Sequence, residues 1–275
     1  MSDDGNVRTT IERRFRTRAL ETPDGLERTA ARLRTAGCIA PEAEALQLVE
    51  AVAGDMDLLD ELVARRARGE PLAWLTGRVR FGGETVLVRP GVYVPRPQTE
   101  ALALEAAARL PEHGLAADLC TGSGAVAVVL RRRRPAARIV ATDIDPRAIV
   151  NARANGVETY WGDMADGLPR DVAGRLDVVT AVVPYVPTAE LRLLPRDVVA
   201  YEPRRSLDGG ADGADLLVRA AVESAPLLRR DGSLLLELGG EQAESLRPLL
   251  RELGYREVRV LRDPEGDPRA VVARR

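Results

Sequence analysis

The feature that most constrains the fold is an alternation of strand-like and helix-like segments that begins near residue 98. Apolar runs predict strands at 115–120, 138–143, 157–162, 176–183 and 233–239. Apolar residues spaced three and four apart predict helices at 98–110, 124–134, 146–155, 212–229 and 241–253. Strands that alternate with helices pair in parallel and have helices on both faces, which predicts a Rossmann-like α/β sheet. Two last runs, around the turn-rich "DPEGD", predict a terminal antiparallel hairpin.

The chain before residue 98 has a different pattern. Residues 1–24 are polar and are predicted to form a flexible N-terminus. Helical spacing recurs at 25–36, 41–53 and 56–68, which predicts a small helical domain over 25–77. Two short strands around a Gly-Gly pair predict a β-hairpin linker over 78–97, and the α/β domain then spans 98–275.

Charge and composition exclude several classes of protein. The formal net charge is −2, and the 40 basic residues, all arginines, are scattered among 42 acids, so we expect no direct nucleic-acid binding. The run "RRRR" at 131–134 ends a predicted helix, where positive charge suits the helix dipole; we favour that reading over a phosphate site.

Metal and membrane sites are also not expected. Cys38 and Cys120 lie far apart, and the single histidine, His113, falls in a loop-like segment, so we predict no disulfide framework and no metal centre. No stretch has the length of a membrane span and the N-terminus lacks the apolar region of a signal peptide. We therefore expect a cytoplasmic protein without a membrane partner.

The most specific motif is "AADLCTGSGAVAVVL", at 116–130. A predicted strand ends in a glycine-rich turn, and Gly122 and Gly124 let the backbone and the helix N–H groups approach a ligand closely. Asp143 ends the next strand, where a carboxylate can accept hydrogen bonds from both hydroxyls of a ribose.

The glycine spacing alone also matches a dinucleotide site. Asp118 argues against one, because it would repel a pyrophosphate but suits the sulfonium and ammonium of S-adenosylmethionine (SAM). Asp163 follows the third strand and can accept a hydrogen bond from an adenine amino group, with Met164 against the ring. Taken singly, Asp143 and Asp163 could each be a helix cap, but three acids at consecutive strand ends favour a SAM site.

Several motifs together resemble those of the HemK-type protein-(glutamine-N5) methyltransferases, which are class I SAM-dependent methyltransferases. They are "GEPLAWLTGRVRF", "VPRPQTE", "DLCTGSGAVAVVL", "ATDIDPRAIVNARAN" and "YEPRRSLDGGADGADLL", and the similarity runs from about Gly69 to the C-terminus. The resemblance implies SAM as cofactor, a peptide chain release factor as partner, and a substrate-recognition role for the helical domain. It implies donor-site roles for these residues: Asp118, Cys120, Thr121, Gly122, Gly124, Asp143, Ile144, Asp163 and Met164. Cys120 stands where the family has its first motif glycine.

The resemblance also implies an acceptor pocket. Arg96, Thr99 and Glu100 of "PRPQTE" would frame it, although Gln98 replaces a usual acid. Tyr201 and Glu202 are further candidates for its wall.

The important departure lies at the catalytic loop, where the family has Asn-Pro-Pro-Tyr and this chain has Val182-Val183-Pro184-Tyr185. The family binds both N–H groups of the acceptor amide, one at the Asn side chain and one at the next backbone carbonyl. Val183 keeps the carbonyl, but Val182 has no side-chain acceptor. One unpaired N–H costs about 1–3 kcal/mol in binding, and we expect a slower transfer on glutamine. Tyr185 could stack on the acceptor, orient it through its hydroxyl, or only pack the loop.

Three alternatives therefore stay open beside glutamine methylation. The enzyme could methylate a small-molecule acceptor. It could use SAM differently, through cyclisation or elimination that releases methylthioadenosine. The protein could also bind SAM without catalysis.

Overall fold

The computed structural model describes residues 23–275 and separates into two compact units. The first comprises Met1–Gly77, as far as it is described, and Arg196–Tyr201; the second comprises Arg78–Pro195 and Glu202–Arg275. The predicted flexible N-terminus lies outside the described residues except for its last two, which begin helix α2 (Pro23–Thr35). No helix within residues 23–275 is long and apolar enough to cross a bilayer.

The first unit is helical. Its elements are α2, α3 (Pro41–Val52), α4 (Met56–Ala67), α5 (Leu72–Thr76) and α9 (Arg196–Tyr201). Asp55 caps α4 by accepting the Leu58 N–H at 3.0 Å. The apolar side chains form one core, made of Ala30, Leu33, Ala45, Leu48, Val49, Val52, Leu59, Leu62, Val63 and Leu75.

Helix α9 belongs to this unit although it lies more than a hundred residues later in the chain. Arg66 of α4 forms a largely buried ion pair with Glu44 at 2.6 Å and reaches Asp197 of α9 at 3.5 Å. The Tyr201 hydroxyl donates to the Arg68 carbonyl at 3.3 Å. These contacts fix α9 to the helices of the first unit.

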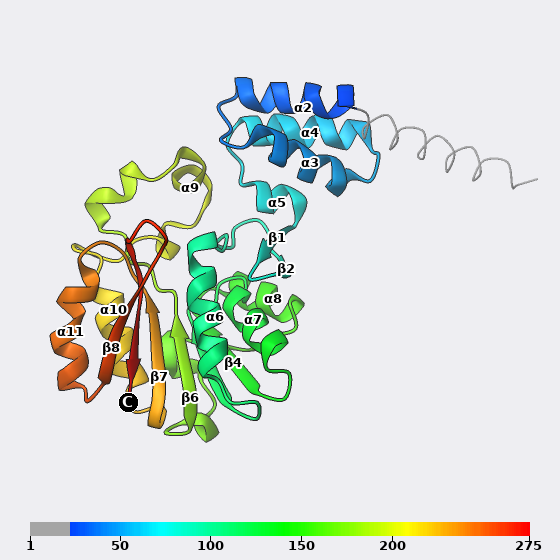
Figure 1. The fold of residues 1–275 in the computed structure, drawn as a ribbon. Coiled ribbons are helices and arrows are strands. Elements are labelled where there is room, and N and C mark those ends of the chain that lie inside the picture. Colours follow the sequence, from blue (N-terminus) through cyan, green and yellow to red (C-terminus); the bar gives the residue numbers. More distant parts are fainter. Residues whose placement is uncertain (1–22) are drawn as a thin grey trace, which may run out of the picture. The chain divides into compact units, whose positions relative to one another are not determined.

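The second unit contains a seven-stranded sheet of order β5-β4-β3-β6-β7-β9-β8 (Figure 1). The strands are β3 (Leu115–Leu119), β4 (Arg138–Asp143), β5 (Glu158–Trp161), β6 (Leu176–Ala181), β7 (Leu228–Glu237), β8 (Arg256–Arg262) and β9 (Pro268–Arg274). The first five are parallel, and β8 and β9 form the antiparallel hairpin. The predicted fold class is thus confirmed. The strand order reverses between β3 and β6, which is where α/β sheets of this kind bind ligands.

Helices pack on both faces of this sheet. They are α6 (Glu100–Arg109), α7 (Ala125–Arg133), α8 (Pro146–Ala154), α10 (Asp215–Ser224) and α11 (Gln242–Glu252). Alternate strand residues, such as Leu234 and Leu236, join a core with α10 and α11. The residue between them, Leu235, points to the opposite face, because side chains alternate along a strand. Helix α6 packs against β6 and β7, and α7 against β3 and β4.

Three predicted elements have wrong boundaries. The helix predicted over 212–229 ends at Ser224, because Pro226 lacks a backbone N–H and disfavours helical geometry before it. The strand predicted over 233–239 begins instead at Leu228. The strand predicted over 176–183 ends at Ala181, so Val182 and Val183 belong to the loop that follows it.

A small hairpin precedes the sheet. Strands β1 (Arg78–Phe81) and β2 (Glu84–Leu87) pair around Gly82 and Gly83, both of which have positive φ angles. Two asparagines of the α8 region hold β2 to the glycine-rich loop. Asn151 Nδ2 donates to the carbonyls of Leu87 and Ser123, at 2.8 and 3.2 Å, and its Oδ1 accepts the Arg89 N–H. Asn155 makes a similar set of bonds, but it is more exposed.

This pair gives a first prediction. We expect N151A to lower the free energy of unfolding by about 2–4 kcal/mol, because Asn151 is fully buried and its partners would lose their hydrogen bonds without access to water. N155A should cost about 1 kcal/mol or less, because water can replace its bonds. Urea unfolding followed by circular dichroism measures both values, and equal losses would contradict the role given to burial.

Candidate functional site

The candidate site lies at the carboxyl edge of the parallel strands, beginning with the loop between β3 and α7. Cys120, Gly122 and Gly124 in this loop all have φ angles between 55° and 85°. A Cβ at Gly122 would project into open space, with Cβ of Tyr93 the nearest atom at 4.0 Å. A Cβ at Gly124 would lie 3.0 Å from that of Ala152, so this glycine lets α7 pack closely on the α8 residue. Cys120 adopts a left-handed conformation that costs a non-glycine residue about 1–2 kcal/mol.

Asp118, in β3, stabilises this loop through a hydrogen bond with Thr121. It is 1% exposed, and its two carboxylate oxygens accept hydrogen bonds from Thr121 Oγ1 at 2.6 Å and Thr180 Oγ1 at 2.7 Å. Burial raises the pKa of Asp118 to about 6. Because both oxygens already accept a hydrogen bond, Asp118 could act on a cation bound here only through its charge and through the position of Thr121.

Asp143 ends β4 and faces the same loop. Its Oδ2 accepts the Gly122 N–H and its Oδ1 the Asp145 N–H, both at 2.8 Å. Burial raises its pKa. The next side chain, Ile144, is 49% exposed, and the neighbouring Trp161 is 67% exposed and donates its Nε1–H to the Ile144 carbonyl at 3.0 Å. An apolar surface suited to a purine therefore adjoins the carboxylate suited to its ribose.

Asp163 and Met164 differ from each other in exposure. The Asp163 carboxylate is partly exposed and pairs with Arg219 of α10 at 2.7 Å. Met164 is 2% exposed, has a φ of 54°, and places its sulfur 3.9 Å from that of Cys120. Thus Ile144, rather than Met164, offers the exposed apolar side chain here.

The loop after β6 carries the predicted catalytic residues. Val183 is 2% exposed and packs in the sheet core, whereas Val182 is half-buried. No residue within 23–275 donates a hydrogen bond to the Val183 carbonyl. Tyr185 donates its hydroxyl proton to Glu237 Oε1 at 3.1 Å, and its own carbonyl accepts from Gln242 Nε2 at 2.9 Å.

Glycines hold the backbone of this loop. A Cβ at Gly209 would lie 2.7 Å from the Pro184 carbonyl oxygen, and one at Gly213 would lie 2.2 Å from the Tyr185 carbonyl oxygen. The "DGGADG" stretch therefore clamps the loop, and only glycine fits at these two positions.

A second polar cluster lies beside the glycine-rich loop. Glu202 is buried; it pairs with Arg96 and also accepts the Val94 N–H at 3.2 Å. The Arg96 guanidinium stacks 4.9 Å from the centre of the Tyr93 ring. Burial raises the pKa of Tyr93 to about 12.

The remaining predicted pocket residues are placed as follows. Thr99 is buried just before α6, and Glu100 is half-buried at its first residue. Tyr201 belongs to the first unit, where it packs edge-to-face on Trp74 with ring centres 6.4 Å apart.

Three residues of this region were not predicted: Tyr93, Trp161 and Glu237. Tyr93 and Glu237 interact electrostatically with each other, and both interact with Tyr185. Each had a weak signal in the sequence, since Trp161 and Glu237 end strands and Tyr93 directly precedes the "VPRP" motif.

These residues fit SAM as a ligand. Gly122 leaves space above the loop, Asp118 and Asp143 supply negative charge for a cation and acceptors for a ribose, and Ile144 supplies apolar surface. The carboxylates of Asp118 and Asp143 would repel a pyrophosphate here. Among the described residues, no three acidic, cysteine or histidine side chains are grouped so as to hold a metal ion.

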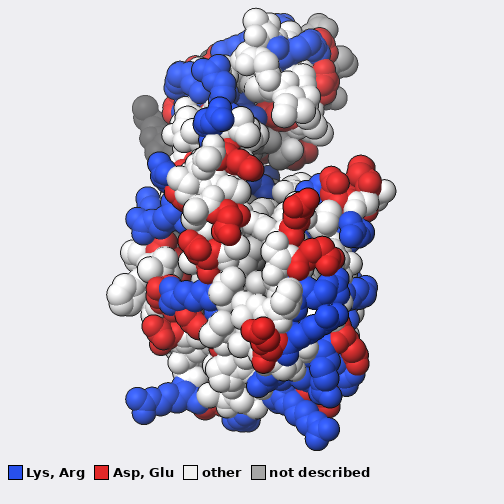
Figure 2. All heavy atoms as spheres, turned by 90° about the vertical axis from the view of Figure 1, so that its left-hand side faces the viewer, with Lys and Arg blue, Asp and Glu red and all other residues white. Residues whose placement is uncertain are grey.

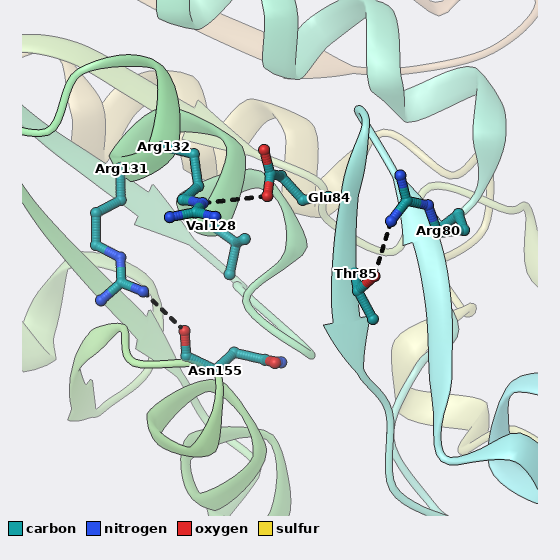
Figure 3. Close-up of a pocket in the computed structure, with 7 residues that line it drawn as sticks. All are labelled: Arg80, Glu84, Thr85, Val128, Arg131, Arg132 and Asn155. Carbon is teal, nitrogen blue, oxygen red and sulfur yellow. Dashed lines mark hydrogen bonds and ion pairs between the residues drawn. The ribbon is translucent and has the colours of Figure 1, made fainter.

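A separate hollow lies between the β1–β2 hairpin and α7 (Figure 3). It contains none of the predicted site residues. Each arginine that lines it donates hydrogen bonds to a neighbour. Arg80 donates to Thr85 and Arg132 to Glu84, and Arg131 donates to the carbonyls of Asn155 and Gly156. Basic and acidic side chains are interspersed over the face drawn in Figure 2.

Comparisons with known proteins agree with this geometry. No protein-family model matches the sequence. A release factor glutamine methyltransferase of Geobacter sulfurreducens is 37% identical over 220 residues, which is 78% of this chain and 76% of the relative. One of Moorella thermoacetica is 39% identical over 223 residues, 78% of each chain. A methyltransferase structure from Pyrococcus furiosus superposes with a TM-score of 0.52 at 18% identity, over 69% of this chain and 87% of the other, which shows a shared fold.

Proposed function

The chain belongs to the release factor glutamine methyltransferases, which are SAM-dependent enzymes, and we propose that it methylates the side-chain amide nitrogen of a glutamine in a peptide chain release factor. Such a substrate implies action in the cytoplasm, where release factors work. We also propose that the helical segment 25–77 recognises the release factor.

The donor side follows from the carboxyl edge of the sheet. When bound, SAM supplies a methyl group on a positively charged sulfur. We propose that Asp143 accepts from the ribose hydroxyls with its remaining lone pairs, and that Ile144 and Asp163 contact the adenine. Asp118 contributes negative charge beneath the loop that holds the amino-acid end, together with Thr121, Gly122 and Gly124.

The acceptor side rests on one observation above all, that the carbonyl of Val183, in the loop after β6, accepts no hydrogen bond from any residue within 23–275. An amide nitrogen is a weak nucleophile, so the protein must fix its N–H groups and aim its lone pair at the methyl carbon. The Val183 carbonyl can accept one of these N–H groups. We propose that Tyr185, Arg96, Thr99, Glu100 and Glu202 complete the pocket.

Mass spectrometry of one reaction tests the proposal. The full-length protein, SAM and the cognate release factor are incubated, with a control that lacks the factor. We expect one methylated glutamine and an equal amount of S-adenosylhomocysteine. An unmodified factor would refute glutamine methylation, and methylthioadenosine in the control would reveal the alternative chemistry of SAM.

The raised pKa of Asp118 predicts a pH dependence of SAM binding. With a folded-state pKa of about 6, Asp118 is protonated at pH 5 and loses its attraction for a cation. We expect SAM to bind about tenfold more weakly at pH 5 than at pH 7. Calorimetry of the protein and of D118N measures this, and D118N should bind weakly at both pH values. If SAM binding to D118N kept the full pH dependence, a group other than Asp118 would be responsible for that dependence.

The same pKa affects stability with the opposite sign. Because the folded-state pKa lies above the usual value of 3.8, unliganded protein binds the extra proton between about pH 4 and 6. The contribution of Asp118 to stability is therefore present below about pH 4 and is lost as the pH rises through 6, a change of roughly 3 kcal/mol. SAM is therefore expected to bind most tightly above about pH 6, where the charged Asp118 carboxylate lowers the stability of the unliganded protein most.

A further inference from the structure

The contact between Tyr185 and Glu237 bears on how this chain works without the asparagine of its family's loop. Glu237 ends β7 and is 2% exposed. Its Oε1 accepts the Tyr185 hydroxyl proton at 3.1 Å, while its Oε2, which is also buried, has no hydrogen-bond partner among residues 23–275. Thr99, whose buried hydroxyl also lacks a hydrogen-bond partner by distance and angle among these residues, interacts with this carboxylate, and the hydrogen bond to Tyr185 is the one that fixes Glu237.

The groups around Glu237 favour its charged form. Burial raises the pKa of Glu237 overall, while the hydroxyls of Thr99 and Tyr185 and the charges of Arg269 and Arg96 favour the carboxylate. Tyr93 and Tyr185 are the other titratable groups that it faces. Burial raises the pKa of both tyrosines, so neither brings a competing negative charge.

A phenol has one proton and two lone pairs. Since Tyr185 gives its proton to Glu237, its oxygen can act only as an acceptor toward any third group. A hydrogen bond to a carboxylate also polarises the phenol and makes its oxygen a stronger acceptor. The pair therefore presents, in the acceptor loop itself, the kind of group that Val182 lacks.

We propose that Glu237 fixes Tyr185 as a hydrogen-bond acceptor, and that the Tyr185 oxygen binds the amide N–H that an asparagine at position 182 would otherwise bind. This inference rests on the proposed glutamine methylation. The substrate amide then donates one N–H to the Val183 carbonyl and the other to Tyr185. As the N–C bond forms, the C–S bond breaks, sulfur keeps its electron pair, and the nitrogen releases one proton to water. Glu237 is a positioning residue, because it acts through Tyr185.

A double-mutant cycle between Tyr185 and Val182 tests this inference. Initial rates of release-factor methylation are measured for the unsubstituted protein, Y185F, V182N and V182N/Y185F. We expect Y185F to lower kcat/KM about 10- to 100-fold in the native background, as the loss of a hydrogen bond to the reacting group does. In the V182N background the restored side-chain oxygen should reduce that loss to less than about threefold.

Two further variants separate this role from packing. E237M keeps an unbranched side chain of similar length but removes the acceptor, which frees the Tyr185 proton. Its loss of rate should also be relieved by V182N. Y160F is the matched control, because Tyr160 likewise donates to a glutamate, Glu158 at 2.6 Å, on an exposed part of β5. Y160F should keep the native rate. Y185F should keep the native SAM affinity, and thermal melting should show a folded protein that is somewhat less stable, because Glu237 loses its hydrogen bond.

The outcomes are distinct. Equal losses from Y185F in both backgrounds, or no loss in the native one, would overturn the role of Tyr185 as the replacement acceptor. An unsubstituted protein that leaves the release factor unmodified would overturn the proposed function as well. Coupling of at least threefold between positions 182 and 185 supports the inference.

Discussion

Replacing Asp143 by alanine is expected to weaken SAM binding by about 100-fold or more. A ribose diol makes two hydrogen bonds to this carboxylate in the proposed complex, and each charge-assisted bond is worth about 1.5–3 kcal/mol. The substitution also removes the acceptor of the Gly122 N–H, so the glycine-rich loop loses a support. Isothermal titration calorimetry with SAM measures the effect.

Asp145 provides the matched control for this experiment. It lies two residues further on and caps α8 by accepting the Arg147 N–H at 2.9 Å. D145A should cost about 1 kcal/mol of stability and leave the SAM affinity within about threefold of the native value. If D143A bound SAM as well as D145A does, Asp143 would have no role in holding the ribose.

Replacing Arg96 by methionine is expected to have the largest effect on stability. Arg96 pairs with the buried carboxylate of Glu202 and also stacks on Tyr93. Removal of one partner of a buried ion pair typically costs about 3–5 kcal/mol, because the other charge stays in a low-dielectric environment. Urea unfolding of R96M at pH 7 measures the loss.

A second substitution distinguishes charge burial from lost packing. R96M/E202Q removes both charges and should regain at least half of the loss seen in R96M. If the double variant were as unstable as R96M, the cost would come from the lost stacking on Tyr93 instead. The ion pair would then be a minor contributor to the fold.

The α/β sheet could be predicted because its signal is repeated along the chain. Each apolar run is followed by a helical pattern, so a wrong boundary at one element leaves the order of the others unchanged. Over 212–229 the helical periodicity continues past Ser224, but Pro226 ends the helix there. The terminal hairpin was predicted from the turn-rich segment between its strands.

Residues of the site could be predicted only where they belong to a short sequence motif. Asp118, Gly122 and Asp143 stand in motifs with a local meaning, and the structure brings them to one loop. Glu237 could not be found in that way, because its meeting with Tyr185 depends on β6 and β7 being neighbours in the sheet. Trp161 likewise gains its place only from the pairing of β5 with β4.

The attachment of α9 to the first unit makes both units discontinuous in sequence. The chain leaves the first unit after Gly77, returns to it at Arg196 and leaves again after Tyr201. A fragment that lacks the residues up to Gly77 would therefore keep α9 but lose the residues that α9 contacts. Asp197 would lose its partner Arg66, and Tyr201 would lose its contact with Trp74. Loss of activity in such a fragment would not separate release-factor recognition from damage to the segment that joins the catalytic loop to Glu202. Single surface substitutions on α2 and α3 are the cleaner way to map the partner.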